Sequence, residues 1–523
     1  MPTSAALLSL SDRQGLDRLA AALRSRGYRL VATSGTAAAI RELGIECEDI
    51  SNLTGFPPLA GGRVKTLHPK VFAGILASRS DEAHVAELER HDIPSFAVVA
   101  VTLYPFERTV GAGATQAQAI EQIDIGGVTL LRAAAKNFAD VTVLSDPRQY
   151  GPFIAALENG GPTQAERRAF AAAAFERCEA YDAAIARYFE SSDPDEDAVL
   201  PATLRMALPR ELALRYGENP WARAAFYLGA DAPPHPRQLS GKILSYNNLL
   251  DVDSCLRLLA PVDEPLGFPS ASRSKGSVRA AIVKHTVPCG CAARDSAATA
   301  LDEALGADPI SAYGGIVACD GRIDAAAAEL LRARFLEVVA APGYDDGALA
   351  VLVGKKNLRV LVFDPGLPAA LIRAPKIRSA LGGVLLEYPD PAAPPDEWRA
   401  VTSASTSAAQ WRDLLFGFGV VRQVKSNAAV VVKDEVTLGV CGGQTNRVAA
   451  VELACRRAGD GARGAALATD GYFPFPDGIE AAAAAGISAV VAPSGSIRDE
   501  EVIAAAARLG LALVFTSRRY FLH

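Results

Sequence analysis

The chain has 523 residues, half of them hydrophobic, and its formal net charge is −6. At roughly 150 residues per domain, this length predicts three or four structural units with substantial cores. The acidic balance argues against a nucleic-acid partner, although it is compatible with a basic pocket for a small phosphorylated ligand. The sequence has no signal peptide, no apolar run of about 20 residues, and eight cysteines without a regular framework. We therefore expect a cytoplasmic protein with reduced, buried thiols and no membrane association.

Short apolar runs alternate with helical patterns over the first 150 residues. Strands are predicted at residues 6–10, 28–32, 96–103 and 141–145, and helices at 16–27 and 36–44 each close on a glycine. Such alternation predicts a parallel sheet with helices on both faces. Because ligands bind beyond the carboxyl ends of the strands in these sheets, the residues that follow the predicted strands are the first candidates for a site.

Anion-binding groups follow several of these predicted strands. Ser11 and Arg13 follow the first run, and residues 33–36 follow the second and open a helix, where free N–H groups favour phosphate. The stretch GGRVKTLHPK (61–70) adds three cations beside two glycines. From charge alone, a solvated basic loop explains this stretch as well as a binding loop does. The agreement between several strand–loop junctions favours an anionic substrate.

Two further positions are candidates for acid–base chemistry. Tyr104 stands where the apolar run 96–103 ends, so its phenol could polarise a carbonyl, although a packing tyrosine is equally common there. Asp124 precedes two glycines and a predicted helix, and helix capping is the favoured explanation for it in isolation. Lys136 lies farther along the same predicted helix, on one face with Arg132.

An acidic, proline-broken stretch at 191–201 divides the chain into two predicted parts, 1–196 and 197–523. The second part is again α/β, and a proline-rich linker near 388–400 is expected to join two subdomains within it. Its strand candidates are residues 280–285, 314–319, 382–387, 427–433, 488–493 and 512–516.

The most informative stretch of the second part is AIVKHTVPCGCA (281–292), where an apolar run ends in Lys284 and His285 before a Pro-Cys-Gly turn. A catalytic pair, a metal site and a plain strand end all fit these residues. A zinc deaminase is disfavoured, because Cys289 and Cys291 are one residue too close and no H-x-E precedes them. The sequence has no P-loop, and GDGARG (459–464) follows a helical run rather than a strand, so neither motif predicts a nucleotide-binding fold.

Long motifs occur in order along nearly the whole chain. They include GGRVKTLHPK, LYPFE, QIDIGG with TLLRAAAKN, LRYGENP, LSYNNLLD, DPISAYGGIVA and FPFPDGIE. The series resembles the bifunctional purine-biosynthesis family in which AICAR transformylase is joined to IMP cyclohydrolase. The resemblance implies a methylglyoxal-synthase-like open parallel sheet at the N-terminus. It also implies a C-terminal α/β region that duplicates a cytidine-deaminase-like fold without zinc.

The resemblance implies a two-step function. The C-terminal region would transfer a formyl group from 10-formyltetrahydrofolate to the 5-amine of AICAR. The N-terminal region would then cyclise the product, FAICAR, to IMP with loss of water. The resemblance also implies a homodimer, and we expect no metal cofactor. A competing hypothesis is a regulatory protein that only senses nucleotides, but phosphate binding alone would need neither Tyr104 nor Asp124.

The resemblance also assigns site residues by position. For the cyclohydrolase, the catalytic residues are Lys65, Tyr104, Asp124 and Lys136, and the substrate-binding residues are Ser11, Arg13, Ser34, Gly35, Thr36, Arg63, Thr66, Thr102 and Ile125. For the transformylase, the catalytic residues are Lys284, His285 and Asn427, and the substrate-binding residues are Arg215, Tyr216, Gly314, Glu337, Arg447, Tyr472, Asp477, Arg519 and His523. A neutral His285 imidazole would take the proton from the poorly nucleophilic amine, while the Lys284 ammonium would stabilise the oxyanion.

Several positions depart from the family pattern. Arg13 stands in place of the usual Lys, Thr102 in place of Asn, and Val287 in place of a polar residue. Tyr472 stands where Phe is usual, and Tyr520 where His is common. The first substitution keeps the positive charge, whereas the second removes an amide that would contact the base.

Overall fold

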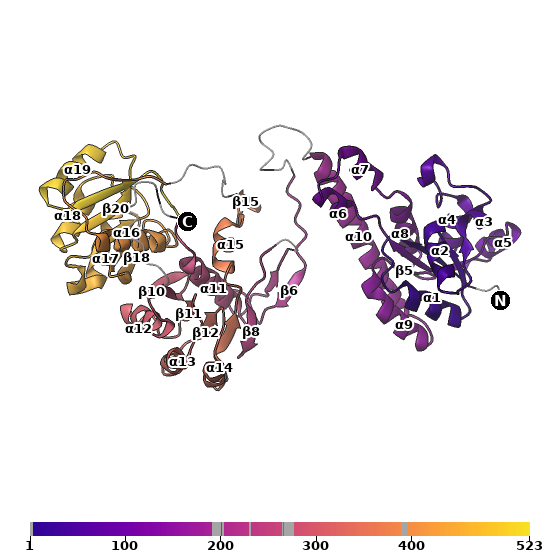
Figure 1. Ribbon diagram of the computed structural model, residues 1–523, viewed down its shortest axis with the longest axis horizontal. Helices are drawn as coiled ribbons and strands as arrows, with labels where there is room; N and C mark the ends of the chain where they lie inside the picture. The colour runs from indigo at the N-terminus through magenta and orange to yellow at the C-terminus, as the bar shows by residue number, and fades with distance from the viewer. Residues whose placement is uncertain are drawn as a thin grey trace. The chain divides into compact units, whose positions relative to one another are not determined.

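The computed structural model describes residues 4–190, 200, 203–229, 232–263, 265, 277–388 and 396–523. The chain divides into two compact units, Met1–Leu204 and Arg205–His523 (Figure 1). The predicted boundary between residues 196 and 197 lies outside the described residues. Each unit buries hydrophobic clusters of its own.

The N-terminal unit is built on a five-stranded parallel sheet with the order β3-β2-β1-β4-β5. Its strands are β1 Ala5–Leu10, β2 Arg29–Ala32, β3 Glu48–Asp49, β4 Phe96–Thr102 and β5 Thr142–Leu144. The four predicted runs form β1, β2, β4 and β5, which confirms the predicted parallel sheet. β3 escapes prediction because its two acidic residues form no apolar run.

Helices cover both faces of this sheet (Figure 1). They are α1 Leu16–Ser25, α2 Ser34–Glu42, α3 Ile50–Thr54, α4 Pro69–Leu76, α5 Glu82–Arg90, α6 Phe106–Gly111, α7 Gln116–Glu121, α8 Gly126–Lys136, α9 Tyr150–Glu158 and α10 Gln164–Glu190. One cluster packs α1, α2 and α9 against one face, and a second packs α3, α4, α8 and α10 against the other. Alternate residues of β1 enter the two clusters, as the pleat of a strand requires.

The C-terminal unit is built on a twelve-stranded sheet with the order β16-β21-β20-β19-β17-β18-β10-β9-β11-β12-β13-β8. Its strands are β8 Arg237–Ser240, β9 Val278–Lys284, β10 Val287–Arg294, β11 Ile316–Cys319, β12 Val338–Ala341, β13 Arg359–Val362, β16 Trp398–Ala400, β17 Ala429–Lys433, β18 Val436–Cys441, β19 Ala466–Thr469, β20 Ala489–Pro493 and β21 Ala512–Thr516. Two separate antiparallel pairs join β6 Arg210–Ala213 to β7 Ala225–Tyr227 and β14 Lys376–Ala380 to β15 Gly383–Glu387.

The helices of this unit cover the two faces of the large sheet differently. They are α11 Tyr246–Leu259, α12 Ala297–Ala307, α13 Ala325–Arg332, α14 Asp346–Val353, α15 Leu367–Arg373, α16 Ala408–Val421, α17 Arg447–Ala458, α18 Asp477–Ala484 and α19 Asp499–Arg508. On one face, a single cluster packs α11, α15 and α16. On the other face, one cluster packs α12 to α14 and another packs α17 to α19, as Figure 1 allows the reader to follow.

The two halves of this unit repeat the same order of elements. The order α11-β9-β10-α12-β11-α13-β12-α14-β13 recurs as α16-β17-β18-α17-β19-α18-β20-α19-β21. From the centre of the sheet outward, one side reads β10-β9-β11-β12-β13 and the other reads β18-β17-β19-β20-β21. The central strands β10 and β18 are antiparallel, so the two halves are related by a two-fold repeat. This topology agrees with the predicted duplication, while the likeness to cytidine deaminase stays a prediction.

Two features of the C-terminal unit differ from the sequence predictions. The predicted Pro-Cys-Gly turn is wrong, because the turn is formed by His285 and Thr286, and Pro288 lies inside β10. The register of β10 against β9 shifts between Pro288 and Gly290, and such an irregularity accommodates a residue that has no N–H group. In addition, β16 falls within the predicted linker at 388–400, of which residues 389–395 lie outside the described part of the chain.

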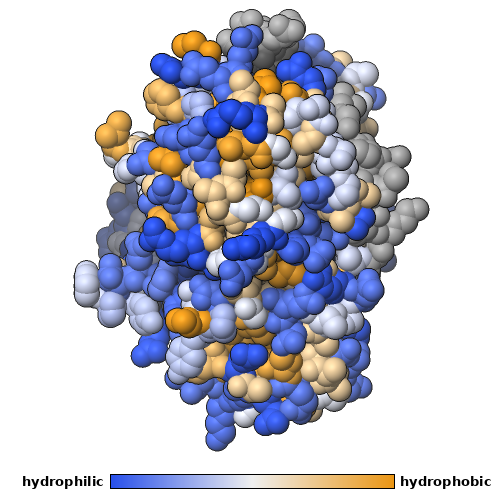
Figure 2. All heavy atoms as spheres, turned by 90° about the vertical axis from the view of Figure 1, so that its left-hand side faces the viewer, coloured by the Kyte–Doolittle hydropathy of each residue, from blue (hydrophilic) through white to orange (hydrophobic). Residues whose placement is uncertain are grey.

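The cysteines are free, and seven of the eight are buried, while Cys289 is half-buried. Their burial agrees with the prediction made from their spacing. Among the described residues, no helix combines the length and the apolar character needed to cross a membrane. Figure 2 shows hydrophilic and hydrophobic residues interspersed over one face of the molecule.

Candidate active sites

A cavity of about 590 Å³ lies beyond the carboxyl ends of β1, β2 and β4 in the N-terminal unit. It brings together most of the predicted cyclohydrolase residues. Those that line it are Ser11, Arg13, Gly35, Thr36, Arg63, Lys65, Thr66, Thr102, Tyr104, Asp124 and Ile125. The cavity therefore lies where an open parallel sheet is expected to bind its ligand.

Three of these residues form a connected acid–base group. The Lys65 ammonium lies 3.3 Å from the Tyr104 hydroxyl and can donate to it. Asp124 accepts the N–H of Gly127 at 2.7 Å, and the N–H of Tyr104 also donates to its carboxylate. Burial raises the pKa of Asp124, against the opposing effects of these N–H groups and of the Lys65 charge. A carboxylate with a raised pKa is suited to accept a proton from substrate.

Tyr181 of α10 fixes the position of Asp124 from behind. Its hydroxyl accepts the N–H of Asp124 at 2.9 Å and donates to the carbonyl of Gln122 at 2.7 Å. Burial raises the pKa of Tyr181 to about 12, so its hydroxyl keeps its proton at neutral pH. A tyrosine at helical spacing indicates only the buried face of a helix, so nothing in the sequence pattern indicates this second role.

The start of α8 packs closely against the side chains of Thr66 and Asp124. A Cβ atom on Gly126 would lie 2.5 Å from the Thr66 hydroxyl, and one on Gly127 would lie 2.4 Å from an Asp124 carboxylate oxygen. Glycine is therefore required at both positions. The same absence of side chains lets the backbone of both glycines line the cavity, where the N–H of Gly127 is already donated to Asp124.

The loops after β1 and β2 form the other wall of the cavity. Thr36 joins them, because its hydroxyl accepts the N–H of Leu10 at 2.9 Å. Arg13 approaches the start of α2, and a Cβ on Gly35 would lie 3.3 Å from its guanidinium. Ser34 is exposed and hydrogen-bonds the Asp49 carboxylate, and it is not among the residues that line the cavity. A cation beside a helix start suits a phosphate.

Two of the predicted binding residues already have protein partners. The Arg63 guanidinium pairs with the Glu121 carboxylate, and both side chains are largely exposed. The Thr102 hydroxyl accepts the N–H of Asp12 at 2.9 Å and donates to the carbonyl of the same residue at 3.2 Å. Thr102 therefore holds the loop after β1, a role that a hydroxyl performs without the amide usual in the family.

Lys136 is not brought into the cavity within one chain. It is the last residue of α8, whose first residue, Gly126, lines the cavity. At 1.5 Å per residue, Lys136 lies about 15 Å farther along the helix axis, and it is exposed. Its assignment to the cyclohydrolase stays a prediction.

In the C-terminal unit, Lys284 and His285 lie where β9 turns into β10. His285 is exposed and Lys284 half-buried. The Lys284 ammonium donates to the carbonyl of Tyr313 at 2.8 Å, and the N–H of His285 donates to the Asp251 carboxylate at 3.3 Å. The pair is thus held at the surface by contacts from α11 and from the loop before β11.

The strand directions gather the other predicted transformylase residues beyond this same end of the sheet. β11 is antiparallel to β9, and β12 and β13 are parallel to β11, so Gly314 and Glu337 lie at the end where Lys284 lies. β18 is antiparallel to β10, and β17 is antiparallel to both β18 and β19. Asn427, which precedes β17, and Asp470, which follows β19, therefore lie at this end as well.

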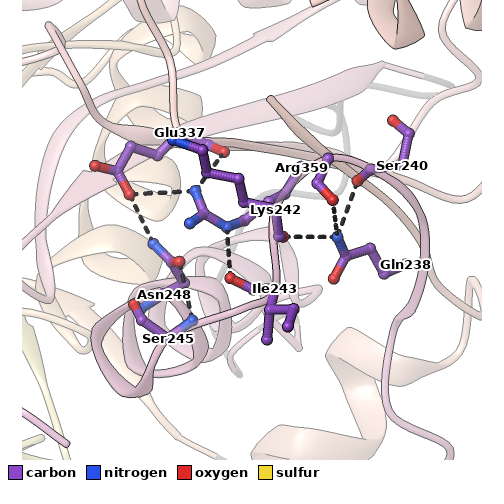
Figure 3. A network of polar contacts seen from close by, with 9 residues as sticks. Gln238, Ser240, Lys242, Ile243, Ser245, Asn248, Glu337 and Arg359 are labelled. Atoms are coloured by element: carbon purple, nitrogen blue, oxygen red, sulfur yellow. Dashed lines mark hydrogen bonds and ion pairs between the residues drawn. The ribbon is translucent and has the colours of Figure 1, made fainter. Parts of the chain in front are cut away.

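A polar network surrounds Glu337 at this edge (Figure 3). The Asn248 amide donates to the Glu337 carboxylate at 2.9 Å, and the Arg359 guanidinium lies 3.5 Å from that carboxylate and donates to the carbonyl of Ile243 at 3.2 Å. Arg215 and Tyr216 act electrostatically on Arg359, which places both beside this network. The Arg215 guanidinium also lies 5.6 Å from the centre of the Tyr216 ring. Neither Asn248 nor Arg359 was predicted from the sequence to be a site residue.

The predicted residues of the second repeat lie in loops and at helix starts at the same edge. The Asn427 amide donates to the carbonyl of Gln444 at 2.9 Å. Arg447 is buried and pairs with the buried Asp470, and its guanidinium donates to the carbonyl of Ala428 at 2.9 Å. Tyr472 and Asp477 belong to the segment that follows β19 and opens α18.

The C-terminal tail is docked against these loops. The carbonyl of Leu522 accepts the N–H of Ser426 at 2.9 Å, and the N–H of Tyr520 donates to the carbonyl of Asp470 at 3.1 Å. Arg519 and His523 are exposed on this tail, and both lie against the Phe521 ring.

Models of known protein families match residues in both units. The model of the AICARFT/IMPCHase bienzyme family matches residues 134–457, and the model of the MGS-like domain matches residues 15–129. The chain belongs to the AICARFT/IMPCHase family. The bifunctional purine biosynthesis protein PurH of Rhodopirellula baltica is 42% identical to it and covers 100% of this chain and 99% of its own length. PurH of Synechococcus sp. (strain CC9311) is 45% identical and covers 99% of both chains. The crystal structure of ForH is 38% identical over 36% of this chain and 98% of that one, with a TM-score of 0.31.

Family membership confirms the predicted class of activity. The chain is a bifunctional enzyme of purine biosynthesis, an AICAR formyltransferase and an IMP cyclohydrolase. Its small-molecule substrates are AICAR and FAICAR, and 10-formyltetrahydrofolate is the formyl donor. This result favours an AICARFT/IMPCHase enzyme over the nucleotide-sensing regulatory protein and over the deaminase. Within the described residues, no group of three or more His, Cys, Asp and Glu side chains is arranged to hold a metal ion.

Proposed function

We propose that the two reactions are divided between the two units. The N-terminal cavity cyclises FAICAR to IMP, and the sheet edge of the C-terminal unit transfers the formyl group. The observation that carries this proposal is the convergence of Lys65, Tyr104 and Asp124 in one cavity, while Lys284 and His285 lie in the other unit.

Cyclisation joins the carboxamide nitrogen of FAICAR to its formyl carbon and releases the formyl oxygen as water. The attacking nitrogen and the formamide nitrogen each lose one proton. The Asp124 carboxylate, whose pKa burial raises, accepts a proton from nitrogen. Lys65 and Tyr104, whose polar atoms are 3.3 Å apart, donate to the formyl oxygen as it becomes an alkoxide and then a leaving water.

The ribose phosphate of FAICAR binds at the opposite wall of the cavity. Arg13 and the start of α2 supply a positive charge and free N–H groups there. Arg63 is a second cation at the cavity, and a phosphate would compete with Glu121 for it. This arrangement places the nucleotide base toward Asp124 and the start of α8.

Formyl transfer forms a bond between the AICAR 5-amine and the formyl carbon and breaks the bond from that carbon to N10 of the folate. The amine loses a proton to the His285 imidazole, which is exposed at the tip of the β9–β10 turn. Lys284 lies next to it and stabilises the oxyanion of the tetrahedral intermediate. N10 takes up a proton as it leaves. Asn427 lies beyond the same end of the sheet and completes the catalytic group.

The purified protein tests this division directly. Mixed with AICAR and 10-formyltetrahydrofolate, it should form IMP, whereas the Asp124→Asn variant should accumulate FAICAR and the His285→Ala variant should form neither product at an appreciable rate. Supplied with FAICAR, the His285→Ala variant should form IMP at the wild-type rate. Loss of both reactions in either variant would contradict the division.

We also propose that the enzyme acts as a cytoplasmic homodimer without nucleic-acid partners. The support is the family resemblance together with the acidic net charge of −6. Light scattering coupled to size-exclusion chromatography should give twice the 54.7 kDa of one chain. A mass of one chain at micromolar concentration would refute the dimer.

A further inference from the structure

The two-fold repeat of the C-terminal unit places a second turn in the position equivalent to the β9–β10 turn. His285 and Thr286 have φ values of 56° and 60°, and Asp434 and Glu435, between β17 and β18, have φ values of 54° and 57°. Both turns thus hold two consecutive non-glycine residues in the left-handed region, which such residues rarely adopt. Each turn must be held by contacts from outside it.

Each of these turns is held by the carboxylate of a different aspartate. The two oxygens of Asp251 accept the N–H groups of His285 and Thr286 at 3.3 and 2.6 Å. Asp413 accepts the N–H of Glu435 at 2.7 Å, and the N–H of Asp434 also donates to it. Both carboxylates are buried, with 7% and 6% of the residue exposed. Burial raises the pKa of each against the opposing hydrogen bonds from its turn.

The two aspartates are equivalent in the repeat. Each is the sixth residue of its helix, Asp251 in α11 and Asp413 in α16. Both helices begin with a serine capping box, formed by Ser245 and by Ser407. The same helix start therefore presents the same carboxylate to the same kind of turn in both halves.

The two turns differ in chemistry and in place. The first carries His285, whereas Asp434 stands at the equivalent position of the second. Because β10 and β18 are antiparallel, the second turn lies at the opposite end of the sheet, on the order of 20 Å from the predicted transformylase residues. One carboxylate thus holds a turn that belongs to the candidate site, and the other holds a turn that does not.

We propose that Asp251 is a positioning residue for formyl transfer: its carboxylate fixes the backbone of the His285–Thr286 turn and thereby aims the His285 imidazole at the AICAR amine. This inference rests on the proposed role of His285 as the base. Asp251 acts through the backbone and does not touch the substrate. Displacing a catalytic base by about 1 Å lowers the rate on the order of 10²-fold. Losing the hydrogen bonds between Asp251 and the turn should therefore lower the rate of formyl transfer measurably.

The equivalent aspartates give a matched pair of variants in the full-length enzyme. Asparagine keeps one acceptor oxygen but turns an N–H donor toward the second N–H of the turn. We expect Asp251→Asn to lower kcat for formyl transfer about 10- to 100-fold, with the KM for AICAR changed less than threefold. Asp413→Asn should leave both constants within twofold. The two variants should lower Tm by similar amounts, and the cyclisation of FAICAR should be unchanged in both.

Two combined variants separate positioning from a general loss of structure. Asp251→Asn should cost nothing further in a His285→Ala background, because its effect passes through the imidazole. Thr286→Gly should restore part of kcat to Asp251→Asn, because glycine adopts the left-handed conformation without being held. If Asp251→Asn does not fold, Asp251→Glu, which displaces the carboxylate by one methylene, replaces it with the same expectations.

The outcomes distinguish this inference from the function on which it rests. If His285→Ala transfers the formyl group at the wild-type rate, the proposed role of His285 is wrong. If His285→Ala retains only a low, measurable rate, but Asp251→Asn and Asp413→Asn lose kcat equally or the losses of Asp251→Asn and His285→Ala add in full, the positioning role of Asp251 is overturned. The expected pattern is a loss confined to Asp251→Asn that disappears in the His285→Ala background.

Discussion

The N-terminal cavity and the C-terminal sheet edge assemble their residues in different ways. The cavity lies beyond the carboxyl ends of three neighbouring parallel strands, so short loops bring its groups together within one small sheet. At the C-terminal edge, β9 and β18 end where β10, β11 and β17 begin. The rule that ligands bind beyond the carboxyl ends of parallel strands therefore predicts the position of the first site but makes no prediction for the second. The residues of the first site come from the loops of one small sheet, whereas those of the second site come together only when the strands of both repeats pair in the correct register.

Separating the two units is the largest change that tests this difference. Residues 1–204 contain their own sheet and both of its hydrophobic clusters. We expect this fragment to cyclise FAICAR at a rate close to that of the full chain and to have no formyl transfer activity. Circular dichroism and a cyclisation assay on the purified fragment check this expectation. A folded fragment without cyclohydrolase activity would mean that the cavity is incomplete in one unit.

Replacing the proposed base should disable only the C-terminal site. We expect His285→Ala to lower formyl transfer by about 10²-fold or more, the usual scale for loss of an acid–base group, with cyclisation unchanged. Asp434→Ala, at the equivalent position of the second repeat, is the control and should leave both reactions within twofold. Steady-state assays with AICAR and with FAICAR separate the two activities. Equal losses in the two variants would show that the turn is structural rather than catalytic.

The reciprocal change in the N-terminal cavity is Lys65→Ala. It removes the ammonium 3.3 Å from the Tyr104 hydroxyl, so we expect cyclisation to fall about 10²-fold while formyl transfer is retained. Lys136→Ala is the informative partner, because Lys136 lies at the far, exposed end of α8. We expect it to lower cyclisation less than Lys65→Ala does. An equal loss would indicate that Lys136 reaches a cavity by a route that one chain does not provide, such as a second subunit.

The N-terminal unit was the more predictable of the two. Four of its five strands are largely apolar runs of three to seven residues, and the parallel order follows from the helices between them. Residues just after β1, β2 and β4 do line the cavity. Periodicity could not identify the contact of Tyr181 with Asp124, because a tyrosine at helical spacing indicates only a buried face. It also could not identify the pairing of Arg63 with Glu121, which are far apart in the sequence.

In the C-terminal unit the sequence predicted the position of the β9–β10 turn incorrectly, and the predicted catalytic residues stay predictions. Lys284 and His285 were singled out, yet the turn was predicted three residues too late in the sequence, because proline and glycine usually mark turns. Here His285 and Thr286 form the turn, and Asp251 supplies the hydrogen bonds that hold it. A contact between residues 34 positions apart leaves no periodic trace in the sequence. Asn248 and Arg359 were missed for the same reason, since only the fold brings them to Glu337.

The smallest expected effect concerns the stability of the N-terminal unit. Burial raises the pKa of Asp124 above its ordinary value of 3.8, so the folded state holds this proton more tightly than the unfolded state does. The stability that Asp124 contributes is therefore fully present below that ordinary value and is lost as the pH rises through the folded pKa. At neutral pH the ionised carboxylate destabilises the unit. Asparagine keeps an oxygen that can accept the N–H of Gly127 but carries no charge.

We therefore expect Asp124→Asn to raise the Tm of the N-terminal unit by about 1–3 °C at pH 7 while abolishing cyclisation, the exchange of stability for activity that active sites show. The gain should shrink toward zero as the pH falls to the ordinary carboxyl range, where the wild-type side chain is protonated in both states. Thermal unfolding of wild type and variant across this pH range measures the difference. If the variant is instead less stable than wild type at pH 7, the Lys65 charge and the N–H groups of Gly127 and Tyr104 stabilise the carboxylate by more than burial destabilises it. Asp124 would then be a capping residue held in its charged form rather than a base that accepts a proton.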